Sequence, residues 1–332
     1  MRGLSVELPT PNGWVRPVNS VSFALGEGET LGIVGESGSG KTMLSLALMG
    51  LLPPGARTSG EAWLRAPAGR SNGSHENGSG ENLLAESLSE MRAARGRRIA
   101  MIFQEPMTAL NPVMRVGAQV AEAIRAHEPS LAAKEINRRV LEALERASVP
   151  EPKRRARQYA HELSGGLRQR VTIAMALAAG PSVLIADEPT TALDVTVQKQ
   201  ISDLLENLRR DLRLSMLFIT HDLGVVAQVA DRVAVMYAGR VVEQGPTGEV
   251  LRRPAHPYTI GLLHAAPRLV REKIEAIPGS VPPLGALPPG CAFGPRCSRH
   301  IAECDAAVPE LATVIAGAET HRARCIRIGG DT

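Results

Sequence analysis

Leu31-Gly-Ile-Val-Gly-Glu-Ser-Gly-Ser-Gly-Lys-Thr42 is the segment of this chain that is most informative about its fold. Its apolar start predicts a buried strand at residues 31–34. The eight residues from Gly35 to Thr42 match the P-loop pattern G-x-x-x-x-G-K-[ST], in which a glycine-rich loop leads from a strand into a helix. The backbone N–H groups of such a loop and the positive end of the helix both face phosphate groups. The stretch therefore predicts that the chain binds a nucleoside triphosphate.

The residue types in this loop follow from the chemistry of phosphate binding. Glycine lacks a Cβ atom, so it lets the chain bend tightly around phosphates at positions 35, 38 and 40. Lys41 supplies a positive charge for the outer phosphates, and the Thr42 hydroxyl can ligate Mg²⁺. The predicted nucleotide-binding residues of the loop are Gly35, Glu36, Ser37, Gly38, Ser39, Gly40, Lys41 and Thr42.

Composition limits the classes of protein to which the chain can belong. Its 332 residues suffice for one large or two small domains. The formal net charge of +4 is mild, and aromatic residues make up only 3%, so no surface for nucleic acid is expected. The first residues lack the apolar segment of a signal peptide, and no apolar run reaches the ~18 residues of a membrane helix. We therefore expect a soluble cytosolic chain that reaches a membrane only through a partner.

Strands and helices alternate along the first 255 residues, which predicts an α/β fold with a mostly parallel sheet. Two N-terminal strands around a turn at Asn12-Gly13 predict a small additional sheet. Trp14, next to this turn, could stack on a nucleotide base or cap the small sheet. Strands are expected at 3–8, 15–25, 31–34, 60–65, 98–104, 182–187, 215–220, 232–236 and 240–243, and helices at 41–50, 167–179, 195–210, 223–230 and 256–266.

Three segments differ from this alternation. Residues 66–80 are rich in Gly, Ser and Asn without periodicity, which predicts a flexible surface insertion. Apolar residues recur at helical spacing between 113 and 157, so an inserted helical subdomain is expected at about 105–170. After about residue 255 the chain becomes rich in Pro and Gly and contains all four cysteines. We therefore expect one domain over residues 1–255 and a small C-terminal domain over residues 256–332.

Two further motifs contain residues that can bind ligands or take part in catalysis. An apolar strand ends in Asp187 and Glu188, where one carboxylate can reach Mg²⁺ and the other can polarise an attacking water. Leu163-Ser-Gly-Gly-Leu-Arg-Gln-Arg170 places a serine and two glycines at a helix N-terminus, which is a second anion site or merely a cap. One chain has no use for two phosphate sites this far apart in sequence, unless two chains sandwich the nucleotide.

The pattern Leu-Ser-Gly-Gly-x-x-Gln-Arg, combined with the P-loop, resembles the signature of ABC transporter ATPase subunits, and the resemblance covers residues 3–255. It implies a RecA-like core with an antiparallel β-subdomain, ATP and Mg²⁺ as ligands, and a head-to-tail dimer. In that dimer Ser164, Gly165 and Gly166 of one subunit bind the ATP held by the other. The resemblance further implies a catalytic base at Glu188, a γ-phosphate contact at His221, a Mg²⁺ sensor at Gln104, a Mg²⁺ ligand at Asp187 and an interface residue at Asp194.

A finer resemblance rests on residues 49–53, 103–112 and 255–259, which are similar to importers of oligopeptides, dipeptides and nickel. The sequence around the P-loop is closer to the D-type than to the F-type ATPase of that family. This implies a subunit that energises import of peptides, with nickel as the alternative solute. The implied partners are a second, F-type ATPase, two transmembrane permeases and an extracytoplasmic solute-binding protein. The implied location is the cytoplasmic face of the cell membrane, as a peripheral subunit.

The four cysteines, Cys291, Cys297, Cys304 and Cys325, follow one another with the spacing C-x₅-C-x₆-C-x₂₀-C. Disulfides are disfavoured in the cytosol, and a short Pro-rich segment with little core favours a metal staple. Neither short gap fits the C-x₂₋₄-C pairs of zinc ribbons. A [4Fe–4S] cluster, a zinc ion and reduced thiols remain open, and the D-type importer ATPases imply the cluster.

Three charged or titratable residues near the cysteines also have alternative interpretations. Arg296 and Arg299 could offset the negative charge of a cluster, or could be exposed arginines. His321 could replace one cysteine as a ligand, or could be solvated. Because the cysteines lie outside the ATPase motifs, we expect them to stabilise the C-terminal segment without any influence on nucleotide binding.

Other ATPase functions are weighed against transport. A soluble ABC ATPase of Fe–S assembly would use the cysteines for cluster traffic, but the His256-Pro-Tyr-Thr259 motif and the Pro-rich tail argue against it. ATPases of DNA repair or translation need long coiled coils or tandem cassettes, which this sequence lacks. A catalytically inactive regulatory cassette would not need Glu188 and His221.

Overall fold

A computed structural model describes residues 1–65, 80–105, 109–191, 193–265, 276–314 and 320–328. The strands are β1 (Arg2–Thr10), β2 (Gly13–Val21), β3 (Thr30–Val34), β4 (Arg57–Glu61), β5 (Trp63–Leu64), β6 (Glu81–Asn82), β7 (Ile99–Ile102), β8 (Val183–Asp187), β9 (Ser215–Thr220), β10 (Arg232–Tyr237), β11 (Arg240–Pro246), β12 (Ala312–Thr313) and β13 (Arg322–Ala323). The α-helices are α1 (Lys41–Leu48), α2 (Leu88–Ala94), α4 (Val116–Arg125), α5 (Ala133–Arg146), α6 (Pro152–Arg155), α7 (Gly165–Leu177), α8 (Val195–Leu212), α9 (Leu223–Val229), α10 (Thr247–Arg252) and α11 (Pro257–Ala265).

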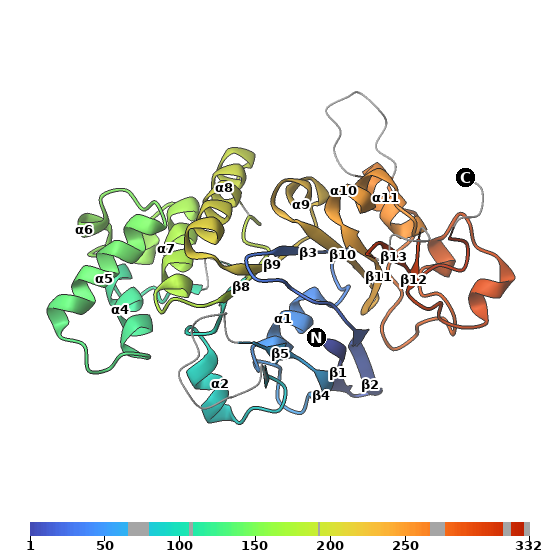
Figure 1. Ribbon diagram of the computed structural model, residues 1–332, viewed down its shortest axis with the longest axis horizontal. Coiled ribbons are helices and arrows are strands. Elements are labelled where there is room, and N and C mark those ends of the chain that lie inside the picture. The colour runs from blue at the N-terminus through green and yellow to red at the C-terminus, as the bar shows by residue number, and fades with distance from the viewer. Residues whose placement is uncertain (66–79, 106–108, 192, 266–275, 315–319, 329–332) are drawn as a thin grey trace.

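A central sheet of eight strands in the order β12-β13-β11-β10-β3-β9-β8-β7 positions the nucleotide site (Figure 1). Strand β3 lies in its middle, runs parallel to β9 and β10, and buries all five of its residues. A fully buried parallel strand is apolar throughout, as Leu31 to Val34 predict. The ends of β3, β8 and β9 meet at one edge of the sheet, where parallel α/β sheets bind their ligands.

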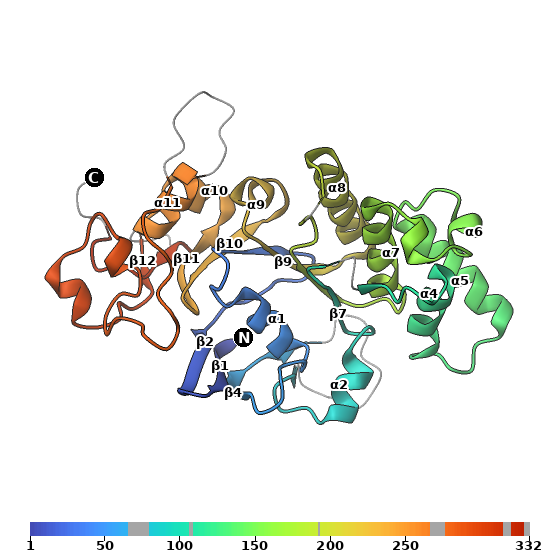
Figure 2. The ribbon, with the colours of Figure 1, turned by 180° about the vertical axis from the view of Figure 1, so that it is seen from behind.

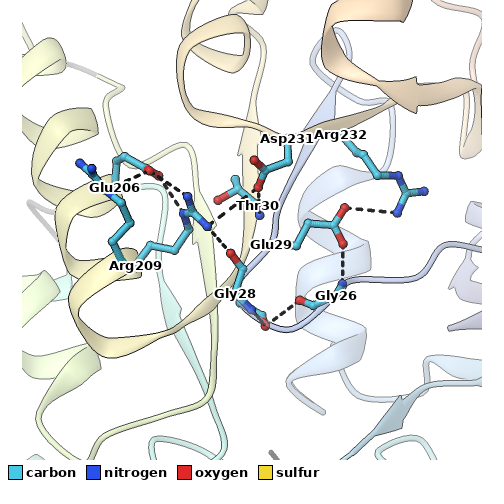
Figure 3. Close-up of polar contacts among 10 residues, drawn as sticks. Gly26, Gly28, Glu29, Thr30, Glu206, Arg209, Asp231 and Arg232 are labelled. Atoms are coloured by element: carbon cyan, nitrogen blue, oxygen red, sulfur yellow. Dashed lines mark hydrogen bonds and ion pairs between the residues drawn. The ribbon is translucent and has the colours of Figure 1, made fainter.

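The loop before β3 is fixed by side chains from distant parts of the chain (Figure 3). The guanidinium of Arg209 on α8 donates to the carbonyl of Gly28 and pairs with Glu206. The carboxylate of Asp231 accepts from the Thr30 N–H at 2.8 Å, just before β10 begins. These contacts hold the start of β3 in register, and the P-loop follows at its other end.

Two smaller layers flank the central sheet, as the views from the front and from behind show (Figures 1 and 2). The N-terminal strands form an antiparallel sheet in the order β2-β1-β4, with α1 between it and the central sheet. Helices α4 to α7 form a subdomain at the opposite end of the molecule from the C-terminal segment. Its core contains Val116, Val120 and Ile124 of α4 and Ile136, Val140 and Leu144 of α5, the positions that helical spacing predicts.

The C-terminal segment is not structurally separate from the rest of the chain. Its strand β13 pairs with β11, so the segment extends the central sheet. Its Tyr258 and Phe293 belong to the same buried cluster as Val34 and Val235 of the central strands. The described part of the segment therefore shares its core with the central sheet, and the boundary expected near residue 255 does not interrupt that core.

Several expected elements differ from those in the structure. The strand expected at 15–25 ends at Val21, and the strand expected at 60–65 is divided between β4 and β5. Helix α2 has no counterpart in the expected elements, although Ser87 and Glu90 cap its N-terminus reciprocally. The predicted flexible insertion at 66–80 lies, except for Gly80, outside the described residues. Among the described helices, none has the length and apolar character needed to span a bilayer.

Candidate functional site

The P-loop lies between β3 and α1, as the sequence predicts, and its glycines are needed there. Gly40 has φ 101° and a Cβ atom on it would lie 2.0 Å from the Pro17 carbonyl oxygen. A Cβ atom on Gly35 would lie 2.2 Å from the carbonyl oxygen of Met236. Both positions therefore require glycine, because side chains there would collide with the backbone of β2 or β10.

Lys41 is folded back into the loop that precedes it. Its ammonium group donates to the carbonyl oxygens of Gly35 at 2.8 Å and Glu36 at 3.0 Å. Burial lowers the pKa of Lys41, and the carboxylates of Glu188, Asp187 and Glu36 oppose that shift. The side chain thus places one buried positive charge at the centre of the loop, where phosphate oxygens could replace the carbonyls as partners.

Asp187, the last residue of β8, lies beside the start of α1. It is 1% exposed, and among the described residues neither of its carboxylate oxygens has a hydrogen-bond partner that meets distance and angle criteria. Burial raises its pKa to about 6, while Thr42 and Lys41 lower it and Glu188 adds to the increase. A buried carboxylate without strong donors, next to a threonine hydroxyl, has the chemistry of a Mg²⁺ ligand.

Glu188 is the point at which the predicted catalytic residues meet. Its Oε2 accepts from the Thr191 hydroxyl at 2.7 Å and lies 3.3 Å from His221 Nδ1 and 3.5 Å from Gln104 Nε2. Its backbone has φ 47°, a left-handed conformation that costs on the order of 1–3 kcal/mol for a non-glycine residue. The structure therefore gathers side chains from the ends of β7, β8 and β9 around one carboxylate. The expected set did not include Thr191, although it follows Asp187-Glu188-Pro-Thr in the sequence.

The signature motif forms a second group of residues. Ser164 caps α7 by accepting from the Leu167 N–H at 3.4 Å, and Asp194 caps α8 by accepting from the Val197 N–H at 2.9 Å. The helices meet closely, because a Cβ atom on Gly166 would lie 2.8 Å from Val197. A Cβ atom on Gly165 would lie 3.5 Å from the side chain of Leu193, just before α8. Helices α7 and α8 lie on the side of the molecule that holds the helical subdomain, whereas α1, into which the P-loop leads, lies next to the N-terminal sheet (Figure 1).

Trp14 lies at the turn between β1 and β2 and is 46% exposed. The guanidinium of Arg57 on β4 lies over its ring, 4.0 Å from the ring centroid. One face of the ring is thus engaged within the small sheet by a cation–π contact. This contact favours the capping role, and stacking on a nucleotide base stays a prediction.

The four cysteines come together around one small pocket. All four line it, together with His256 and Phe293, and none of them is in a disulfide. Burial raises the pKa values of the Cys291, Cys297 and Cys325 thiols. Within the described residues, however, no group of three or more His, Cys, Asp or Glu side chains is placed so that it could hold a metal ion. The convergence of the thiols is as predicted, and what they bind stays a prediction.

Both expectations for His321 are wrong. It is 1% exposed, so it is not solvated, and it does not line the cysteine pocket. Its Nε2 lies 2.8 Å from Oε1 of Glu243, which is fully buried on β11 and also accepts from the His256 N–H. The pair fixes β13 against β11, which explains why a histidine near the cysteines is not available to their pocket.

Comparison with known proteins agrees with this geometry. Residues 18–191 match the ABC transporter family, and residues 242–304 match the C-terminal region of oligopeptide/dipeptide transporters. The chain is 49% identical to a putative peptide import ATP-binding protein of Brucella ovis, over 98% of this chain and 96% of that one. It is 48% identical to the oligopeptide transport ATP-binding protein OppD of Salmonella typhimurium, over 92% and 88% of the two chains.

Solved structures show the same fold. The dimeric structure of MJ0796, a bacterial ABC transporter cassette, matches with a TM-score of 0.62 and 27% identity, covering 74% of this chain and 97% of that chain. A post-hydrolysis dimer of the same cassette, bound to ADP and Pi, matches with a TM-score of 0.60 and 26% identity over the same shares. With a P-loop, a capped signature helix and a carboxylate cluster in the arrangement described above, this chain belongs to the ABC transporter family and is an ATP-hydrolysing cassette.

Proposed function

We propose that this chain energises the import of peptides across the cell membrane. The main support for this proposal is the cluster of side chains around Glu188, next to the P-loop. The C-terminal segment of the same chain matches the C-terminal region of oligopeptide/dipeptide transporters. The relatives named for peptide import cover nearly the full chain. Nickel import is the second possibility that the sequence raised, and nothing in the described structure favours it.

The residues around Glu188 support in-line attack of water on the γ-phosphate. Glu188 accepts the proton of the water, while His221 and Gln104 hold the carboxylate and the water in line. Lys41 stabilises the charge that develops on the γ-phosphate oxygens. Thr42 and Asp187, with Gln104 nearby, would hold Mg²⁺, which would supply further charge neutralisation. The two buried carboxylate oxygens of Asp187 without partners fit this role.

The separation between the P-loop and the signature supports a dimer. We propose that Ser164, Gly165 and Gly166 of one subunit complete the nucleotide site of the other, with Asp194 at the interface. The second subunit would be an F-type ATPase, and two permeases and an extracytoplasmic solute-binding protein would complete the importer. The chain would then lie on the cytoplasmic face of the membrane as a peripheral subunit.

Purification of the assembled transporter tests this proposal. We expect one copy of this chain, one copy of a second ATPase and two permeases by mass. We expect ATP hydrolysis in liposomes to rise with peptide-loaded binding protein. Two copies of this chain without a second ATPase would refute the heterodimer, and stimulation by Ni²⁺ but not by peptides would refute peptide import.

We further propose that the cysteine pocket holds a [4Fe–4S] cluster with a structural role. A single zinc ion with Zn–S bonds of about 2.3 Å would draw the sulfurs to within ~4 Å of one another. In a cube-shaped cluster each thiolate binds a different iron, so the sulfurs stay farther apart. The convergence of the four thiols on one pocket, in a chain whose C-terminal segment matches the oligopeptide/dipeptide transporter type, supports the proposal. Binding would release the protons that burial retains on three of the thiols.

Anaerobic purification tests this second proposal. We expect about four iron and four sulfide per chain and a brown colour that Cys297→Ser removes. Elemental analysis distinguishes iron from zinc. Stoichiometric zinc without sulfide would reject the cluster, and four thiols that react with an alkylating agent in the native chain would favour reduced cysteines.

A further inference from the structure

Arg296 connects the cysteine segment to the P-loop. It ends the short 3₁₀ turn Gly294–Arg296, directly before Cys297, and its side chain is 4% exposed. Its two terminal nitrogens donate to the two carboxylate oxygens of Glu36, at 2.7 and 3.0 Å. Glu36 is the second residue of the P-loop, 260 positions away in sequence. The expectation that Arg296 is exposed is therefore wrong, and its charge is already paired with a carboxylate of the P-loop.

The position of the guanidinium is fixed by two further contacts. Its Nε donates to the Pro278 carbonyl at 2.8 Å, and one terminal nitrogen donates to the Tyr237 hydroxyl at 3.3 Å. Contacts with Glu36, Pro278 and Tyr237 hold the planar guanidinium in one position, so it cannot follow Glu36 if the P-loop moves. The bidentate pair therefore forms only when the P-loop adopts the position seen here. The backbone of Glu36 is held as well, because its N–H donates to the Tyr258 hydroxyl at 2.8 Å.

The negative charge of the Glu36 carboxylate is unfavourable in a loop that binds phosphates. It lies close enough to Lys41 to oppose the decrease in the pKa of that lysine, and the Glu36 carbonyl accepts from the same ammonium group. An unpaired carboxylate at this place would attract Lys41 away from the phosphates and repel a triphosphate. The bidentate pair with Arg296 removes both effects.

We propose that Arg296 is a positioning residue for ATP, which neutralises the Glu36 carboxylate and holds it on the C-terminal segment, away from the phosphates. The C-terminal segment then contributes to ATP affinity although none of its residues needs to touch the nucleotide. This role does not depend on the transported solute.

ATP affinity of the purified full-length chain tests the proposal. We expect Arg296→Gln to weaken ATP binding on the order of tenfold at low salt, because Glu36 loses its charged partner. Salt should reduce this difference, since it screens the repulsion. Arg296→Lys keeps the charge but not the fork, so an intermediate affinity is expected. Arg322→Gln is the matched control, because Arg322 donates to the Leu311 carbonyl within the same segment.

The decisive variant is the double substitution. If Arg296 acts by neutralising Glu36, adding Glu36→Gln to Arg296→Gln removes the unpaired charge and restores most of the affinity that Arg296→Gln loses. Equal losses in the single arginine variant and the double variant would overturn the proposal, as would normal ATP binding by Arg296→Gln. The double variant also covers the case in which Arg296→Gln alone fails to fold, because it leaves no unpaired charge and a tenfold loss of affinity in it would contradict charge neutralisation.

Discussion

Different kinds of interaction stabilise the ATPase core and the C-terminal segment. The core rests on parallel strands that are buried over their full length, such as β3 and β9. The described part of the C-terminal segment has two strands of only two residues each. Besides the apolar cluster that its Tyr258 and Phe293 share with the core, it is anchored by buried polar side chains, of which Arg296 and His321 each pair with a carboxylate of the core. A few buried polar contacts thus add to a small apolar interface, and each of them matters individually.

The largest effect is expected in the chemistry of the core. Glu188→Gln keeps the shape of the side chain but removes the proton acceptor, so turnover of the assembled transporter should fall by roughly 10²–10⁴-fold. ATP binding should be retained, because Glu188 is not a phosphate ligand. Steady-state ATPase activity and nucleotide binding are measured on the same preparation. Near-normal turnover in this variant would contradict the role of Glu188, whatever the state of the C-terminal segment.

A large effect is also expected where the C-terminal segment is anchored. His321→Ala removes one member of a fully buried pair and leaves Glu243 with only backbone donors. The free energy of unfolding should fall by roughly 3 kcal/mol. Urea unfolding and hydrogen exchange at β11 and β13 measure this loss, with Arg322→Gln as the exposed control. Unchanged stability would mean that the segment is held by its apolar contacts, as the core is.

A smaller effect is expected from pH at the Mg²⁺ site. The pKa of Asp187 is raised to about 6, so lowering the pH through 6 protonates the carboxylate and removes it as a ligand. Affinity for MgATP should then decrease by up to about tenfold per pH unit below that value. Affinity for ATP measured in EDTA should decrease less over the same range. Parallel decreases with and without Mg²⁺ would exclude Asp187 as the titrating group.

The smallest effect is expected for ion pairs on the surface of the helical subdomain. Arg138 on α5 pairs with Glu135 and Glu142, and all three side chains are at least one-third exposed. Solvent screens such pairs, so Arg138→Gln should leave the thermal midpoint of the full chain unchanged within error. A shift as large as that of His321→Ala would show that exposed pairs stabilise this molecule as much as buried ones, and the contrast between the two regions would fail.

The nucleotide chemistry of this protein follows from local sequence patterns. The P-loop, the signature and Asp187-Glu188 are local patterns, and the strands before them are apolar runs whose burial follows from composition. Their order along the chain was therefore sufficient to predict the α/β fold and the ATP site. The shorter elements β4, β5 and α2 are predicted less well from the sequence, because their formation depends on the surfaces on which they pack.

The contacts between distant residues, in contrast, become visible only in the folded molecule. Thr191 joins Glu188, His321 pairs with Glu243, and Arg296 reaches Glu36 across 260 positions. No periodicity or spacing reports such pairs, because an arginine or a histidine has the same local pattern whether it is solvated or buried. What distinguishes the two is the free energy of burying a charge, which becomes acceptable only when the fold brings an opposite charge to the same place.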